Sequence, residues 1–130
     1  MKKDIPIRKV ENIAIAIVPK DEDLWDVFLI NLKEAPIRNV LVNSKGYGEV
    51  DNKKVETTCL RYYYEGVLPE TAVKIEPIQT KLFHIAHEYW VSFQYDNFMF
   101  DKKYVFVRGS IHEELFTSVP ILDCKGIMIK

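Results

Sequence analysis

The fold class follows most directly from residues 88–107, which read EYWVSFQYDNFMFDKKYVFV. In the first half of this stretch, Tyr89, Val91 and Phe93 fall on one side of an alternating pattern. A period of two is typical of a β-strand, because successive side chains point to opposite faces of a sheet. The dipeptide Asp96-Asn97 then supplies turn chemistry before a second segment rich in aromatic residues and valine. The stretch therefore predicts a β-hairpin.

Further extended segments are predicted on both sides of this hairpin. They cover residues 10–18, 24–32, 37–44, 54–64 and 72–78, with one or two short strands within 118–130. Residues 24–32 are apolar on both faces, as expected of a strand that is covered on both sides. Their short connection to residues 37–44 predicts a second hairpin. Pro77 lies near the end of its segment, which suits an edge strand.

The intervening segments are predicted as turns and short helical pieces. Gly46-Tyr47-Gly48 is interpreted as a turn, because glycine tolerates the positive φ angles that tight turns require. It also lacks the following helix that would let a glycine-rich loop hold phosphate. Residues 79–87 fit a loop or one helical turn, and residues 110–117 fit a capped helical turn. Cys59, in a predicted strand, is interpreted as a small buried residue.

About seven to nine strands, at spacings of roughly ten residues, favour two packed sheets over a parallel α/β sheet. The sequence predicts an all-β fold, namely an antiparallel β-sandwich with an immunoglobulin-like arrangement. The paired cysteines and central tryptophan of antibody domains are not reproduced, so the prediction concerns architecture alone. The sequence has no internal repeat and no linker composition, which predicts a single domain over residues 1–130.

Composition and charge restrict the classes of protein to be considered. Hydrophobic residues make up 48% of the 130 residues and charged residues 28%, a balance typical of a folded globular protein. The 18 basic and 19 acidic residues give a net charge of -1, so no overall positive field would attract nucleic acid or anionic lipid. Residues 1–20 lack the apolar run and cleavage site of a secretory signal. We therefore expect a cytoplasmic protein without a membrane span or a cofactor.

Three histidines have carboxylates nearby and form a candidate metal site. His84 and His87 are three residues apart, and His112 is followed by two glutamates. Residues three apart on a helical turn face the same way, so the first two could share a divalent metal with a third ligand from the fold. Two histidines in a polar loop are more often solvent-facing. The same groups could act as acid and base, although no nucleophile accompanies them.

Exposed aromatic and basic residues form candidate interaction surfaces. Rings at Trp90, Phe98 and Phe100 could present a patch to another protein, although such rings more often fill a core. Arg61 and Tyr63 belong to a segment that interleaves a cation with tyrosines, a combination that single-stranded RNA can exploit. Alternation directs at least one of the consecutive tyrosines toward the core.

Four segments carry a resemblance to a known group of proteins. They are VENIAIAI at 10–17, SKGYGE at 44–49, VKIEPI at 73–78 and DKKYVFV at 101–107. The chain resembles small bacterial proteins of unknown function that are often labelled as a phenylalanyl-tRNA synthetase subunit. That label implies binding of ATP, phenylalanine and tRNA, which needs a large catalytic domain with class-specific motifs. No such domain fits here, so we interpret the label as a misnaming and transfer no catalytic residue.

The leading hypothesis is a non-enzymatic module that binds another protein or a ligand. It follows from a sandwich pattern without a catalytic constellation. The second hypothesis is an RNA-binding or synthetase-related accessory protein, based on the resemblance and on the tyrosine-rich basic segment. The third is a metal-dependent enzyme that uses the histidines.

Overall fold

The computed structural model describes residues 9–130, which form ten strands and two short 3-10 helices. The first part of residues 1–20, which were considered above for a secretory signal, lies outside the described residues. The elements are β1 (Ile13–Pro19), β2 (Leu24–Asn31), β3 (Ile37–Val50), β4 (Lys53–Glu56), β5 (Leu60–Val67), β6 (Thr71–Gln79), η1 (Thr80–Leu82), β7 (Ala86–Tyr95), β8 (Phe98–Phe106), η2 (Glu113–Leu115), β9 (Thr117–Val119) and β10 (Cys124–Ile129). No helix within this range has the length and apolar character needed to cross a membrane.

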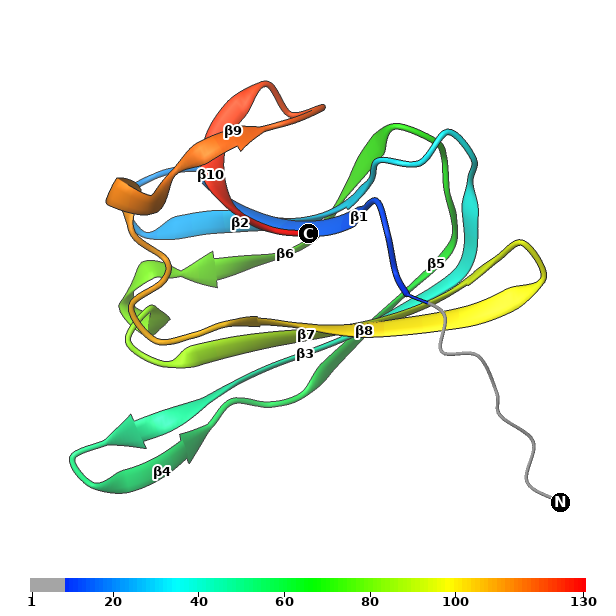
Figure 1. Cartoon of the computed structure of the whole chain (residues 1–130). Helices are drawn as coiled ribbons and strands as arrows, with labels where there is room; N and C mark the ends of the chain where they lie inside the picture. Colours follow the sequence, from blue (N-terminus) through cyan, green and yellow to red (C-terminus); the bar gives the residue numbers. More distant parts are fainter. Residues whose placement is uncertain (1–8) are drawn as a thin grey trace, which may run out of the picture.

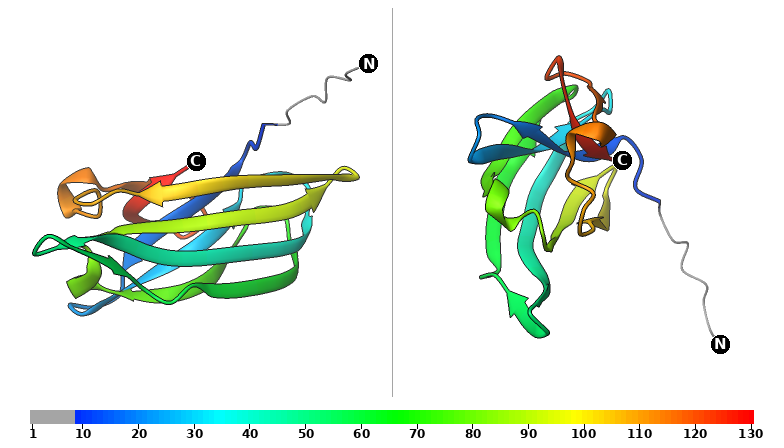
Figure 2. Two further views of the ribbon diagram at one scale, coloured as in Figure 1. Left: turned by 90° about the horizontal axis from the view of Figure 1, so that it is seen from below. Right: turned by 90° about the vertical axis from the view of Figure 1, so that its left-hand side faces the viewer.

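The strands form two antiparallel sheets that face each other (Figures 1 and 2). The first sheet has the order β6-β2-β1-β10-β9. In the second, β7 lies between β3 and β8, while β4 and β5 pair with successive halves of the long strand β3. The predicted antiparallel β-sandwich is confirmed, with more strands than the seven to nine expected. The immunoglobulin-like arrangement stays a prediction.

The main core lies between the two sheets. Alternation sends Ile13, Ile15 and Ile17 of β1 inward, where they meet Tyr89 and Phe93 of β7 in one buried cluster. The opposite face of β1 carries Ala14 and Ala16, which belong to a second, smaller cluster. The small side chains on this face leave room for the β9–β10 segment, whose Val119 is buried in the same cluster. β2 is covered on both faces, as predicted, because its Val27 and Leu29 lie in the main cluster and its Ile30 lies in the smaller one.

The hairpin predicted from residues 88–107 is confirmed as β7–β8, with continuous pairing from His87↔Phe106 to Tyr95↔Phe98. Asp96 and Asn97 have φ angles of 51° and 63°, the left-handed pair that a two-residue hairpin turn requires. The second predicted hairpin is wrong. β2 and β3 belong to different sheets, so their short connection crosses the sandwich instead of reversing within one sheet.

The interpretation of Gly46-Tyr47-Gly48 as a turn is also wrong, because all three residues lie inside β3. A Cβ added to Gly46 would lie 3.0 Å from Ile85 Cδ1, and one added to Gly48 would lie 3.0 Å from Ile85 Cγ2. The glycines thus allow Ile85, which follows η1, to approach the backbone of β3. The reversal occurs instead at Asp51 and Asn52, whose φ angles are 51° and 64°.

The segment predicted as one strand over residues 54–64 is divided into β4 and β5. Thr57 lies at the break, where its hydroxyl accepts a hydrogen bond from the Gly46 amide at 2.7 Å. Cys59 follows and is exposed, so its interpretation as a buried residue is wrong. This break separates the two strands that pair with β3 and leaves an opening beside them.

Strand β6 lies at the edge of the first sheet, as Pro77 predicted. Its pairing with β2 shifts register between Val27 and Phe28, which pair with Glu76 and Lys74 and leave Ile75 unmatched. Such a β-bulge changes the direction in which the following side chains point. Both Ile75 and Ile78 are buried, and Glu76 turns toward the second sheet.

Candidate functional site

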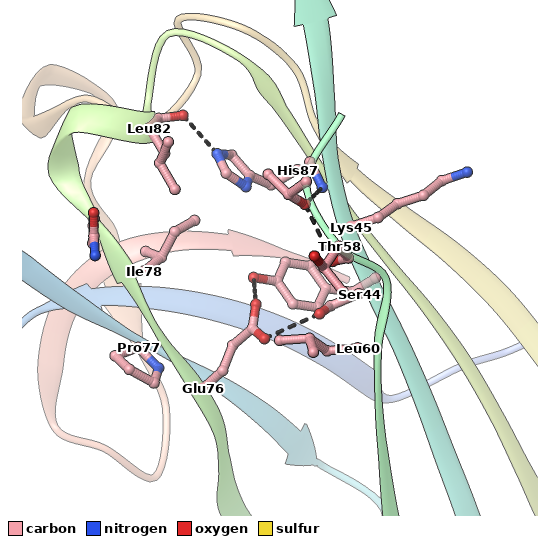
Figure 3. Close-up of a pocket in the computed structure, with 13 residues that line it drawn as sticks. Ser44, Lys45, Thr58, Leu60, Glu76, Pro77, Ile78, Leu82 and His87 are labelled. Carbon is pink, nitrogen blue, oxygen red and sulfur yellow. Dashed lines mark hydrogen bonds between the residues drawn. The ribbon is translucent and has the colours of Figure 1, made fainter. Parts of the chain in front are cut away.

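The residues around Glu76 form a pocket of about 280 Å³ between the two sheets, near the open edge where β6 faces β5. We call it the Glu76 pocket. It is lined by Ser44, Lys45, Gly46, Thr57, Thr58, Leu60, Glu76, Pro77, Ile78, Gln79, Leu82, His87 and Tyr89. Figure 3 shows Glu76 and His87 on opposite sides of this space, with Ile78 and Leu60 beside it. Ligand sites in proteins have this mixed character, with an apolar lining and a few convergent polar groups.

Three hydroxyl groups of the opposite sheet donate hydrogen bonds to the Glu76 carboxylate. Tyr62 and Ser44 donate to Oε1 at 2.6 and 3.0 Å, and Tyr89 donates to Oε2 at 2.8 Å. Tyr89 is 1% exposed and Ser44 is 3% exposed, so both donors are fixed by the surrounding core. Because hydroxyls that donate to an ionised acceptor form strong hydrogen bonds, this arrangement holds the carboxylate in one orientation.

The same contacts keep the tyrosines protonated. Burial is the largest cause that raises the pKa of Tyr62 and of Tyr89, and the hydrogen bond and negative charge of Glu76 add to it. The two phenols therefore act as donors toward Glu76 throughout the physiological pH range. They do not act as bases there.

The negative charge of Glu76 has no cationic partner among the residues that the structure describes. Among residues 9–130, ion pairs join only Lys74 to Asp26 and Lys103 to Glu88. Lys45 is the one lysine or arginine among the described residues of the lining, and its Nζ lies 5.7 Å from the ring centre of Tyr47. Figure 3 shows this amino group directed away from the pocket. The pocket therefore contains a half-buried anion that is stabilised by neutral donors alone.

His87 is 5% exposed and has a fixed tautomer. Its Nε2 lies 2.7 Å from the carbonyl oxygen of Leu82, and since a carbonyl only accepts, Nε2 carries the proton and donates. Burial lowers the pKa of His87 below its usual value, while the Leu82 bond and the charge of Glu76 oppose this shift. The ring is thus neutral at physiological pH. Its Nδ1 is an acceptor, which Figure 3 shows turned toward the pocket.

The hydrogen bonds of the Glu76 pocket do not activate the Ser44 hydroxyl as a nucleophile. The Ser44 hydroxyl donates to Glu76, and His87 bonds to the backbone of Leu82. In a catalytic serine site, the histidine must instead accept the serine proton. The arrangement can bind and orient a molecule that offers hydrogen-bond donors.

The three histidines predicted as a metal site are not brought together as ligands. His87 lines the pocket, whereas His84 is exposed beyond η1. His112 is exposed as well, and its Nδ1 accepts a hydrogen bond from the Glu114 amide at 3.1 Å, which caps η2. Within residues 9–130, no group of three or more His, Cys, Asp or Glu side chains is positioned to hold a metal ion.

The predicted interaction residues are divided between the two faces of the second sheet. Trp90 and Tyr63 are 42% and 61% exposed on the outer face, where Arg61 also lies. Phe100 points inward and stacks on Phe93 at 5.3 Å between ring centres. Phe98 shares this inward side at the end of β8 and is 42% exposed. Trp90, Phe98 and Phe100 therefore do not form one patch.

Sequence reasoning missed most of the pocket, including Glu76, Ser44, Tyr62 and Tyr89. A signal for Glu76 was present, because the buried apolar residue after Ile75 is Ile78 and not residue 77. Side chains on the same face of a regular strand are two positions apart, so a spacing of three between buried residues indicates a β-bulge. Comparisons with protein-family models, with curated proteins and with solved structures found no match.

Proposed function

We propose that this protein is a non-catalytic binding module that takes up a small molecule in the Glu76 pocket. The observation that carries the proposal is the acceptor set inside an open pocket, namely the fixed carboxylate of Glu76 and the Nδ1 of His87. Apolar side chains of Leu60, Ile78 and Leu82 surround these acceptors. Preorganised polar groups in an apolar lining bind ligands well, because little ordering is required on binding.

The outer face of the second sheet supports the RNA hypothesis less well. Arg61 and Lys103 flank Asn43 and Trp90 in one cross-strand row. Lys103 is already engaged, since its Nζ lies 4.9 Å from the ring centre of Trp90 and 3.9 Å from a Glu88 oxygen. Glu88 therefore offsets the positive charge of Lys103 on this face. A nucleic-acid site requires an excess of positive charge to neutralise phosphates.

An NMR titration tests binding in the pocket. We expect members of a panel of small cationic, neutral and anionic aromatic molecules to shift the backbone amides of Gly46, Thr58 and Gln79. Amides of the outer face, such as those of Leu41 and Ser92, should stay unchanged. The proposal is overturned if no member of the panel shifts the pocket amides at its solubility limit.

A pair of leucine variants supplies the matched control. Leu60 is 46% exposed at the pocket and Leu68 is 68% exposed elsewhere, so both sites accept a larger side chain. Leu60→Trp should narrow the pocket and weaken probe binding at least tenfold, whereas Leu68→Trp should leave binding unchanged. Equal binding to both variants would place the probe outside the pocket.

A further inference from the structure

The strongest unexplained feature of the pocket is the uncompensated charge of Glu76. An ionised carboxylate offers about four lone-pair sites for hydrogen bonds. Ser44, Tyr62 and Tyr89 fill two sites on Oε1 and one on Oε2, which leaves one acceptor site on Oε2. A charge that is partly withdrawn from water is costly unless a partner of opposite sign approaches it.

The rest of the pocket favours the same kind of partner. His87 presents Nδ1 as a neutral acceptor, because its Nε2 proton is committed to the Leu82 carbonyl. Lys45, the lining's basic residue, extends its amino group away from the cavity (Figure 3). An incoming anion would therefore meet Glu76 without a compensating cation, and a ligand without N–H or O–H groups would leave both acceptors unsatisfied.

Resting on the proposed function, we infer that the ligand of the Glu76 pocket is a small organic cation with at least two N–H donors and an apolar body. One N–H group pairs with the free site of Glu76 Oε2, and a second donor is available to His87 Nδ1. The apolar body lies against Leu60, Ile78 and Leu82. Planar amidinium and guanidinium groups fit this role, because they combine a positive charge with several N–H donors in a fixed fork.

Three molecules of nearly equal shape separate charge from size. Benzamidine is a cation, benzamide is its neutral isostere and benzoate is the corresponding anion. We expect NMR titrations to show benzamidine in the pocket with a Kd at least tenfold lower than that of benzamide, and benzoate to bind more weakly than both. This comparison uses the unmodified protein, so it does not depend on whether a variant folds.

Variants then assign the preference to one carboxylate. Glu76→Gln should raise the Kd of benzamidine at least tenfold while changing the Kd of benzamide little. Glu65, exposed on the outer side of the adjacent strand β5, supplies the matched control. Glu65→Gln should leave both affinities unchanged.

The possible outcomes distinguish this inference from the proposed function. Binding of benzamide or benzoate in the pocket with equal or higher affinity than benzamidine would overturn the cation inference and leave a small-molecule site in place. Shifts caused by benzamidine on the outer face alone would also overturn it. If none of the three molecules shifts the pocket amides, while other members of the panel do, the inference fails and the proposed function stands.

Discussion

The hydroxyl of Tyr89 contributes to stability through a single hydrogen bond to Glu76 Oε2, at 2.8 Å. Tyr89→Phe removes this donor while keeping the ring in the core. Oε2 then loses the one donor that it has within residues 9–130, so we expect the free energy of unfolding to fall by about 1–3 kcal/mol. Urea denaturation followed by circular dichroism measures the change.

Tyr63→Phe is the control for this prediction. The Tyr63 hydroxyl donates to Asn39 Oδ1 at 2.9 Å, but the ring is exposed on the outer face. Water can replace that bond, so a change within about 0.5 kcal/mol is expected. Equal losses in the two variants would contradict a special role of the Glu76 cluster.

His87 predicts how stability depends on pH. Burial lowers the pKa of His87 in the folded protein, and the nearby His84 also lowers it, against the opposing Leu82 bond and Glu76 charge. The unfolded chain, in which His87 has its usual pKa of 6.5, therefore binds a proton more readily than the folded protein does. The stability contributed by the neutral ring is fully present above that pH and is lost as the pH falls toward the folded pKa, by at most about 1.4 kcal/mol per pH unit.

Variants isolate this effect from the titration of carboxylates. In His87→Gln, the amide can still donate to the Leu82 carbonyl but does not titrate. Unfolding free energies measured between pH 8 and pH 5.5 should fall less steeply in this variant than in the unmodified protein. His84→Gln, at an exposed position, removes only the smallest contribution to the lowered pKa of His87, so it should keep most of the steeper slope. An unchanged slope in His87→Gln would contradict the prediction.

At the scale of elements, the alternation of apolar and polar residues predicted most strands. Each of these strands buries one face, so the pattern can be recognised within a few neighbouring residues. Ile13, Ile15 and Ile17 were assigned to one face of a strand from their spacing alone, and all three are buried in the main core. The misplaced turn at Gly46 has a different cause. The two glycines of β3 are explained by the approach of Ile85, and a contact between distant segments leaves no local signal.

The candidate site was harder to predict than the strands. Glu76 and Lys74 look alike in the sequence, as two polar residues of a half-buried strand. A bulge separates their environments, so Glu76 meets three hydroxyls of the other sheet while Lys74 forms an ion pair with Asp26 at 3.1 Å. The partners of Glu76 come from β3, β5 and β7, and only the packing of two sheets brings them together.

Strand β10 needs a glycine at position 126, where its backbone lies very close to β1. A Cβ added to Gly126 would lie 2.5 Å from the carbonyl oxygen of Ile17 and 2.7 Å from Val18 Cγ1. The neighbouring atoms belong to the backbone and to a buried side chain, so they yield only at a cost. We expect Gly126→Ala to destabilise the protein by about 1–3 kcal/mol.

Gly66→Ala is the control. It tests whether the loss of stability comes from the close contact of the added Cβ at Gly126, or whether replacing any strand glycine by alanine has the same effect. A Cβ added to Gly66 would meet only the Ile37 carbonyl oxygen, at an ordinary 3.5 Å. This variant should be close to neutral in the same denaturation experiment. A Gly126→Ala protein as stable as the unmodified protein would contradict the prediction, because β10 would then be able to move away from β1 at little cost.

At the scale of the whole molecule, the two sheets differ in how far apart in the chain their paired strands lie. In the second sheet, β7 and β8 are joined by a two-residue turn. In the first sheet, β1 pairs with β10, which brings Ile15 opposite Ile129. Closing so long a loop costs entropy before any contact forms, so pairing of the chain ends should come late in folding.

Two truncations to alanine test this order of events. Val91 is buried in β7 and Ile127 is buried in β10, so each variant should lose enough stability for its folding and unfolding rates to be compared. Val91→Ala should slow folding, because the β7–β8 hairpin forms in the transition state. Ile127→Ala should mainly accelerate unfolding, since its contacts with β1 form afterwards. Stopped-flow measurements over a range of urea concentrations give both rates, and a folding rate reduced more by Ile127→Ala than by Val91→Ala would contradict the predicted order.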